Sequence, residues 1–274
     1  MREQIEELRQ KSLGRLCELF GPWLPLDLFT PAAKGLNSRD RTFPLGLTFW
    51  AFLNQVLNPG SPCREVVRRV QAWYAKRTEP LPKSGTGGYC QARKRLPLEI
   101  LRQTNQELAA KLTDPIRESG AWDGHRVHVV DGTGLSMPDT PENRKAHSQP
   151  SGQKTGCGFP VMKIVGVFCL QTGALIRWAQ GQLKEHECRV FMKLLDFFKP
   201  GDIVLVDRGF CGYGQLAGLW DNGVESVMRL HQRRKVDWRR GARLGARDRL
   251  VTWKRPYRQT SVFDAAAWAA LPRK

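Results

Sequence analysis

The sequence lacks any apolar run long enough to cross a bilayer. Its best candidate, FPLGLTFWAFLNQVL at residues 43–57, is short and contains Asn54, which is typical of a buried helix. The first residues, MREQIEELRQ, are acidic and polar, unlike a signal peptide. We therefore expect a soluble cytoplasmic protein with no membrane partner.

Cysteine is sparse and unpatterned. The seven cysteines are odd in number, and no two of them have Cys-x-x-Cys spacing. These features argue against a disulfide framework and a structural zinc site, so we expect reduced thiols in the core or on the surface. The glycine-rich stretch GTGGY, residues 85–89, also lacks the lysine of a phosphate-binding P-loop.

Acidic residues are few beside basic ones. The 274 residues include 26 Asp and Glu against 44 Lys and Arg, a formal charge of +18, which points to a polyanionic partner and above all to nucleic acid. From Arg229 to Arg258 there are twelve Lys and Arg against two Asp. A basic stretch can simply be a solvated face, but this density favours phosphate contact.

Apolar residues recur at helical spacing through roughly the first 120 residues. In PCREVVRRVQAWYAKR, residues 62–77, Val66, Val70 and Trp73 share one face. The basic segment SGTGGYCQARKRLP, residues 84–97, predicts a second, short helix after a glycine-bearing turn. Such a pair is compatible with a DNA-binding helix-turn-helix and equally with a helical bundle that has a basic surface.

After Gly124 the pattern changes to short apolar runs separated by turns. Thr172-Gly173 is expected to join two strands in a hairpin, and Asn222-Gly223 to end a helix. The predicted strands are RVHVVD (126–131), VMKIVGVFCL (161–170), ALIRWAQGQ (174–182), IVLVD (203–207) and VESVMRL (224–230), with helices at 185–198 and 212–223. The expected order is strand, strand, strand, helix, strand, helix, strand.

Two of these strands end on an acid followed by a glycine-containing turn. Asp131 precedes Gly132, and Asp207 precedes Arg208-Gly209. Either acid alone can be a turn residue or a helix N-cap. If the first and fourth strands are neighbours, however, both carboxylates emerge together, and a cation between them relieves their repulsion. Mg²⁺ suits two carboxylates and a substrate phosphate, so the pair indicates metal-dependent phosphoryl transfer.

The strand order and the two acids resemble those of the ribonuclease-H-like nucleases. The stretches VVDGTGLSMPDTPEN and DIVLVDRGFCGYGQLAGLWDNGVESVMRLHQRR further resemble bacterial insertion-sequence DDE transposases, in the Tyr-Arg-Glu-Lys branch of the fourth insertion-sequence family. The resemblance runs from about residue 60 to the end of the chain. It implies catalytic and metal-binding roles for Asp131 and Asp207, with Mg²⁺ as cofactor and Mn²⁺ as a substitute.

The third catalytic acid of that family has no counterpart in this sequence. The family places a Glu within Tyr-x2-Arg-x3-Glu-x6-Lys, but no Glu follows Tyr257 here. We therefore expect the N-terminal portion of a longer transposase, without its last catalytic helix. The expected division is a helical DNA-binding domain at 1–120, a ribonuclease-H-like mixed sheet at 121–230, and the start of a basic, strand-rich insertion subdomain at 231–274, with a first hairpin at 249–258.

The resemblance implies that the partner is double-stranded DNA, both at transposon ends and at target sites. It also implies that the protein self-associates on this DNA, in the bacterial cytoplasm at the nucleoid. Trp238 can either stack on a DNA base or pack in the protein core, and both interpretations stay open. Trp253 is expected to pack in the core. A catalytically inert DNA-binding fragment is the alternative function. The predicted DNA contacts, any of which can also be solvated charges, are Arg93, Lys94, Arg95, Lys154, Arg208, Arg233, Arg234, Lys235, Arg239 and Arg240.

Overall fold

The computed structural model describes residues 12–30, 33–35, 41–119, 122–150, 152, 154, 158–234, 237, 239–260 and 262–273, with only the backbone at 117–119. The chain divides into two compact units, Met1–Lys111 and Leu112–Lys274. Within the described residues no helix is both long and apolar enough to span a membrane.

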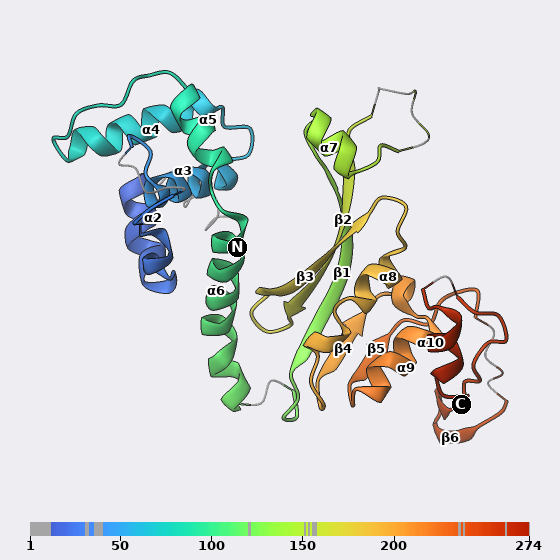
Figure 1. Cartoon of the computed structure of the whole chain (residues 1–274). Helices are drawn as coiled ribbons and strands as arrows, with labels where there is room; N and C mark the ends of the chain where they lie inside the picture. Colours follow the sequence, from blue (N-terminus) through green and yellow to red (C-terminus); the bar gives the residue numbers. More distant parts are fainter. Residues whose placement is uncertain are drawn as a thin grey trace. The chain divides into compact units, whose positions relative to one another are not determined.

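The first unit is built from helices (Figure 1). Ser12 caps the first described helix by accepting a hydrogen bond from the backbone N–H of Arg15 at 3.3 Å, and Pro44 and Pro62 stand just before the next two α-helices. The elements are α2 (Leu13–Phe20), η1 (Gly21–Trp23), η2 (Leu26–Phe29), α3 (Leu45–Leu57), α4 (Cys63–Lys76), α5 (Gly87–Lys94) and α6 (Leu98–Ser119), whose last residues belong to the second unit.

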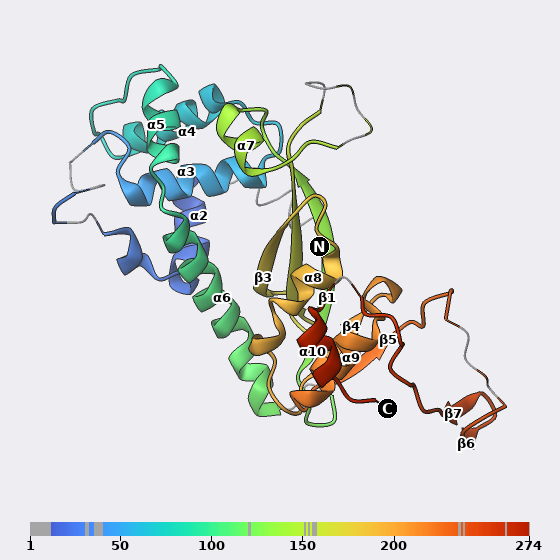
Figure 2. The same ribbon diagram turned by 45° about the vertical axis from the view of Figure 1, so that its right-hand side comes forward.

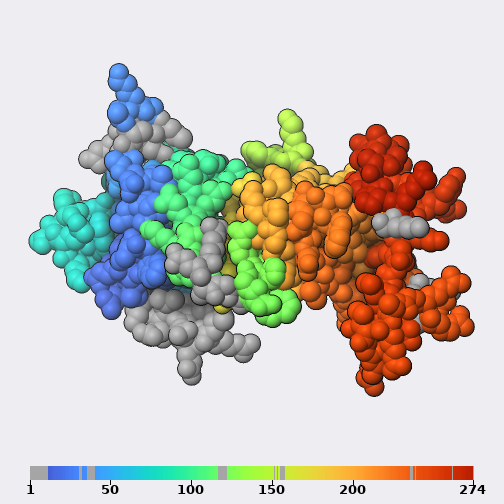
Figure 3. All heavy atoms as spheres, turned by 90° about the horizontal axis from the view of Figure 1, so that it is seen from below, coloured from blue at the N-terminus to red at the C-terminus, as the bar shows by residue number. Residues whose placement is uncertain are grey.

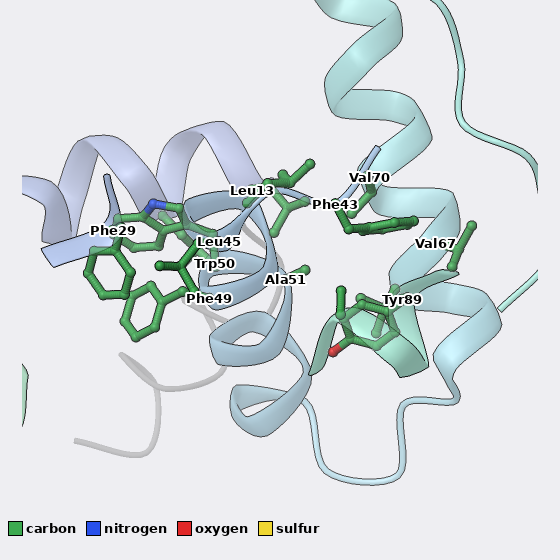
Figure 4. Packing of buried hydrophobic residues seen from close by; sticks show 14 of the residues in the cluster. Leu13, Phe29, Phe43, Leu45, Phe49, Trp50, Ala51, Val67, Val70 and Tyr89 are labelled. Carbon is green, nitrogen blue, oxygen red and sulfur yellow. The ribbon is translucent and has the colours of Figure 1, made fainter. Parts of the chain in front are cut away.

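The core of the first unit forms around α3. Figure 4 shows Phe29, Phe49 and Trp50 on one side of this helix, with Phe43 and Tyr89 on the other. Asn54, 1% exposed, accepts a hydrogen bond at Oδ1 from Arg69 Nη1 at 3.1 Å and so links α3 to α4. The apolar run at 43–57 is thus a buried helix, as its length and its single asparagine predicted.

A compact helix-turn-helix does not form between α4 and α5. Residues 77–86 separate them, which is longer than the turn of about three or four residues in that motif. Thr78 has a positive φ of 59°, and Gln71 donates to the Pro82 carbonyl at 2.8 Å, so the connection runs back along α4. The glycines at 85, 87 and 88 predicted a turn but could not indicate its length.

The second unit contains a five-stranded mixed sheet of order β3-β2-β1-β4-β5 (Figures 1 and 2). Strands β1 to β3 are antiparallel neighbours, and β1, β4 and β5 run parallel. The strands are β1 (Val127–Ser136), β2 (Val161–Cys169), β3 (Leu175–Gln182), β4 (Ile203–Val206) and β5 (Glu225–Met228). This confirms the predicted fold class, including the adjacency of the first and fourth strands.

Two α-helices, α8 (Glu187–Met192) and α9 (Tyr213–Asp221), connect β3 to β4 and β4 to β5. The predicted helix at 185–198 is interrupted after Met192 and continues as the short η3 (Leu195–Phe197). The two glycine turns are confirmed, because Gly173 between β2 and β3 and Gly223 after α9 have φ of 70° and 67°. A further helix, α7 (Pro141–Ala146), follows β1.

One face of the sheet carries the core of the second unit. Val130, Val165 and Val204 pack there with Phe191 of α8 and Leu219 of α9. Since successive strand residues point to opposite faces, Val129 and Leu205 lie on the other face, where they are only half-buried. The sheet therefore has a helix-covered face and a more open face.

The basic C-terminal part forms a small hairpin, β6 (Ala242–Gly245) with β7 (Asp248–Leu250), and the helix α10 (Ala265–Ala270). The prediction of a hairpin at 249–258 was wrong in position, because only its first two residues pair and the segment from Val251 to Pro256 has no strand structure. Trp268 of α10 packs on Tyr213 and Ala217 of α9. Figure 3 shows the red C-terminal segments beside the orange atoms of the preceding part of the same unit.

We expect Phe191→Ala to lower the free energy of unfolding by about 3–5 kcal/mol, since it empties a ring-sized space in the core. Phe191 is 1% exposed, and its ring centroid lies 5.6 Å from that of Phe210 and 6.1 Å from that of Phe198. The matched control is Phe159→Ala, at a ring that is 60% exposed. Urea unfolding measures both variants, and an equal loss in the free energy of unfolding would contradict the placement of Phe191 in the core.

Candidate active site

The two predicted acids lie at the same end of neighbouring parallel strands. The register of β1 with β4 runs from Val127 opposite Ile203 to Val130 opposite Val206. Asp131 and Asp207 are the next residue on each chain. Because neighbouring strands are roughly 4.8 Å apart, the two acids are adjacent across the sheet.

Both side chains point to the open face of the sheet. Asp131 alternates with Val130, which belongs to the helix-covered core, and it is paired with Gly166 on β2. Asp207 follows Val206, another residue packed against that core, and its φ of −75° and ψ of 174° continue the extended backbone. Both acids are exposed. Register and alternation thus bring two solvent-facing carboxylates together on one face.

Each carboxylate is held by one local hydrogen bond. Asp131 Oδ1 accepts from the N–H of Gly132 at 2.8 Å, and Asp207 Oδ1 accepts from the N–H of Gly209 at 2.7 Å. Asp207 thereby caps the short η4 helix (Arg208–Phe210). The turn-residue interpretation is therefore correct for one oxygen of each acid. In the part of the chain that the structure describes, neither Oδ2 has a hydrogen bond or an ion pair.

A third carboxylate, that of Glu187 on α8, approaches the acid pair from the covered face. A Cβ built on Gly132 would lie 3.0 Å from its carboxylate, so this position has no room for a side chain unless Glu187 moves. Gly132 and Asp131 point to opposite faces, which places Glu187 behind the strand relative to the Asp131 carboxylate. The sequence did not single out Glu187, because nothing but the fold brings the start of α8 to β1.

Cys188 connects α8 to the turn that carries Asp207. Its thiol donates to the Gly209 carbonyl at 3.2 Å, and the residue is 6% exposed. Burial, together with the negative charges of Glu187 and Asp207, raises the pKa of this thiol to about 11. The neutral thiol is thus the form that holds the turn.

This pKa predicts a stability change at high pH. A raised pKa in the folded state contributes stability that is complete below the ordinary thiol value of 9.0 and is lost as the pH rises through about 11. We therefore expect the advantage of wild type over Cys188→Ala in free energy of unfolding to shrink from pH 9 to pH 11. Urea unfolding at each pH measures it, and a constant difference would refute the prediction.

Three cations, on β2, in the segment before it and in the turn after Asp207, have different surroundings. Arg208 donates from Nη1 to Gln232 Oε1 at 3.0 Å, so its side chain lies toward the segment after β5. Lys163, on β2 opposite Gly134, donates to the Glu185 carbonyl at 2.9 Å. Lys154 is exposed. The structure thus places no described Lys or Arg in an ion pair with either acid.

Arg234 is an inward-pointing arginine of the basic segment that follows β5. Arg234 donates to the Cys211 carbonyl, with Nε at 3.0 Å, and its guanidinium lies 4.0 Å from the centre of the Trp253 ring. Trp253 packs against the α9–α10 core, as predicted. This pairing fixes the segment onto the second unit, a role that sequence composition could not separate from DNA contact.

The other predicted basic residues of this segment are more exposed. Arg239 and Arg240 both pair with Asp237, at 3.0 and 3.4 Å, and their side chains are 91% and 88% exposed. Hydrogen bonds from the Arg239 side chain and backbone lower the pKa of Asp237. Lys235 and Trp238 lie outside the described residues. A cavity of about 680 Å³ is lined by Leu230, Arg233, Arg234, Asp237, Arg240, Gly241, Arg249, Val251, Thr252, Trp253 and Lys254.

In the first unit the predicted cations sit on and just after α5. Arg93 donates from Nη1 to Gln55 Oε1 at 3.0 Å, and that oxygen also accepts from the Tyr89 hydroxyl at 2.7 Å. Lys94 is exposed and Arg95 is half-buried. Arg93 is thus oriented by contacts with α3, while Lys94 points into solvent.

The donor set at the acid pair suits a hard divalent cation. Two carboxylates on adjacent strands each keep one oxygen unengaged among the described residues, and carboxylate oxygens are the ligands that Mg²⁺ prefers. The described residues contain no group of three His, Cys, Asp or Glu placed to hold a metal. The pair alone would therefore leave most coordination positions to water and substrate.

Comparisons with known proteins identify the family. The family described as "Transposase DDE domain" matches residues 122–262. The Escherichia coli (strain K12) protein "Transposase InsG for insertion sequence element IS4" is 26% identical over 222 residues, which cover 79% of this chain and 48% of that protein. The chain thus spans about half the length of this curated relative.

A solved structure titled "Cryo-EM structure of piggyBac transposase synaptic complex with hairpin DNA (SNHP)" is similar at 11% identity and a TM-score of 0.33. The similarity covers 77% of this chain and 46% of that one. The family match covers more than half of the chain and includes both acid-bearing strands. This chain belongs to the DDE transposase family.

Proposed function

We propose that this chain takes part in metal-dependent DNA strand cleavage and transfer at the ends of a bacterial insertion sequence, through Asp131 and Asp207. The adjacency of the two acids at the ends of β1 and β4 is the observation that supports it. Mg²⁺, or Mn²⁺ in its place, would bind between these carboxylates and supply an activated oxygen nucleophile and stabilisation of the leaving oxygen.

The protein's own groups orient this pair. The N–H groups of Gly132 and Gly209 each donate a hydrogen bond to Oδ1 of one acid. The Oδ2 atom of each acid is then the oxygen proposed to bind the metal on the open face. The Cys188 thiol holds the Gly209 carbonyl and so stabilises the turn after Asp207. Because both carboxylates are exposed, a DNA phosphate can approach them without any opening of the core.

DNA binding is proposed for two basic regions. One is the basic segment after β5, where five cations line the cavity of about 680 Å³ against a single acid, Asp237. The other is the end of α5, with Arg93, Lys94 and Arg95. Phosphate contacts of this kind provide affinity and register without reading sequence. Self-association on DNA is part of the proposal, since two transposon ends must be brought together.

Iron-mediated cleavage of the polypeptide tests the metal site. Fe²⁺ bound in place of Mg²⁺, with ascorbate and peroxide, generates radicals that cut the backbone close to the ion. We expect the backbone to be cut near residue 131 and near residue 207 in the same experiment. Added Mg²⁺ should suppress both cuts by displacing Fe²⁺, and Asp131→Asn should abolish them. Cuts elsewhere, or cuts that Asp131→Asn leaves unchanged, would overturn the proposed site.

A second candidate function is a DNA-binding fragment without catalysis. It is favoured by the described residues, in which no group of three His, Cys, Asp or Glu is placed to hold a metal. A strand-cleavage assay on DNA that carries the insertion-sequence ends separates the two functions. Binding without any cut supports the inert fragment, which would act as a remnant or an inhibitor, and cutting supports the transposase.

A further inference from the structure

A buried charged cluster lies at the opposite end of the two strands that carry the acids. Asp202, just before β4, is 2% exposed, and its Oδ1 lies 2.6 Å from Arg126 Nη2. Its Oδ2 lies 3.3 Å from Nε2 of His128, whose side chain is 8% exposed. Neither contact has hydrogen-bond geometry, so the first is an ion pair and the second is a close approach of a ring nitrogen to the carboxylate. Arg126, His128 and Asp202 form what we call the strand-start cluster.

Asp202 remains charged in this position. Burial alone would raise the pKa of its carboxyl, but contact with His128, the Lys199 backbone N–H at 2.9 Å and the charge of Arg126 together lower it. Asp202 is 2% exposed and the Arg126 side chain 35% exposed, so removing Arg126 would leave a buried carboxylate without this cation.

The backbone around the cluster aligns three strands. Ile203 N–H donates to the Arg126 carbonyl at 2.9 Å, and Glu225 N–H donates to the Asp202 carbonyl at 3.0 Å. These bonds start the β1–β4 and β4–β5 ladders. From there the ladder continues to Val130 opposite Val206, with the two acids next in line. A shift of one residue in this register would send either acid to the other face.

We propose that the strand-start cluster sets the register of β1 against β4 and thereby positions Asp131 and Asp207 for one divalent cation. The buried Asp202 carboxylate meets both Arg126 on the approach to β1 and His128 within it in only one register. The rigid ladder of paired residues carries that register to the acids. This inference rests on the proposed function, since it assigns the cluster a positioning role toward the metal-binding pair.

The decisive variant is Arg126→Met, because direct electrostatics and positioning predict opposite results. Arg126 is a cation, so its loss would leave Mn²⁺ affinity unchanged or slightly raised if charge alone mattered. Across roughly 16 Å of strand, beyond the screening length of about 8 Å at physiological salt, that effect is small. Positioning predicts a loss of about tenfold to 100-fold, as for partners that orient metal ligands.

Titration of the full chain with Mn²⁺, followed by electron paramagnetic resonance of the free ion, measures the affinity. Arg126→Lys keeps the charge and is expected to restore affinity to within about threefold. Arg177→Met, at an exposed arginine on β3, is the matched control and is expected to bind as wild type. Should Arg126→Met not fold, Asp202→Asn, which keeps the shape of the carboxylate, is expected to show the same loss.

The outcomes separate this inference from the proposed function. Wild-type binding that depends on Asp131, together with unchanged binding by Arg126→Met, would overturn the inference and leave the proposed metal site standing. Absence of Mn²⁺ binding in wild type would overturn the proposed site and the inference with it. Faster amide hydrogen exchange at Leu205 in Arg126→Met than in Arg177→Met is expected, and equal exchange would also count against the cluster's role.

Discussion

Asp131→Asn and Asp207→Asn are each expected to weaken Mn²⁺ binding by about 100-fold. A carboxylate in contact with a divalent ion at roughly 2.1 Å contributes about 4 kcal/mol by Coulomb's law even at the dielectric constant of water, and a replacing water ligand recovers part of this. Isothermal titration of the folded chain with Mn²⁺ measures the change. The two variants should lose similar affinity, since the acids occupy equivalent places on β1 and β4.

The asparagine substitution isolates charge from local structure. Asn Oδ1 can still accept the N–H of Gly132 or Gly209, so the turn at each strand end is retained. If the acids served only as turn residues, the Asn variants would differ little from wild type in both stability and metal affinity. The matched control, Asp196→Asn, removes an exposed carboxylate on η3 and should bind Mn²⁺ as wild type. Equal affinity in Asp131→Asn and Asp196→Asn would contradict the shared site.

The position of the acids could be predicted from the sequence because it depends on short-range pattern and topology. An apolar run such as IVLV identifies a strand, and its last residue falls at the strand end whatever the tertiary detail. The order of strands and helices then places β1 beside β4, as observed. Alternation along the extended backbone decides the face of each acid, because Val130 is buried in the core and Val206 packs against it.

What the sequence could not predict depends on contacts between distant segments. Arg234 looks like any other arginine of the basic segment, yet it stacks on Trp253 and binds the Cys211 carbonyl. Glu187 reaches Gly132 only because the fold brings the start of α8, which packs on β2 and β3, beside that glycine. The charged cluster at Asp202 joins residues 126 and 202, whose pairing is a property of the register and not of either local sequence.

The affinity of this chain for DNA is expected to fall by a factor of about 10³ to 10⁵ between 50 and 200 mM salt. This is the loss known for a protein that makes about 6–10 phosphate contacts. The net charge of +18 and the cations lining the cavity after β5 supply the contacts. Fluorescence anisotropy with a labelled duplex, repeated across salt concentrations, gives the slope of log affinity against log salt. A slope near zero would contradict the proposed role in DNA transposition.

Two exposed arginines of the basic segment test where the DNA phosphates bind. Replacing Arg233 and Arg240 together, each by Gln, should lower the magnitude of the slope by about 1.8, at about 0.9 for each phosphate that is no longer neutralised. Arg234 is unsuitable, because its guanidinium already holds Cys211 and Trp253 and its removal would disturb the fold. The matched control replaces Arg177 and Lys199, which are exposed, by Gln and should leave the slope unchanged. Equal effects of both pairs would mean that net charge alone, and not this segment, attracts the DNA.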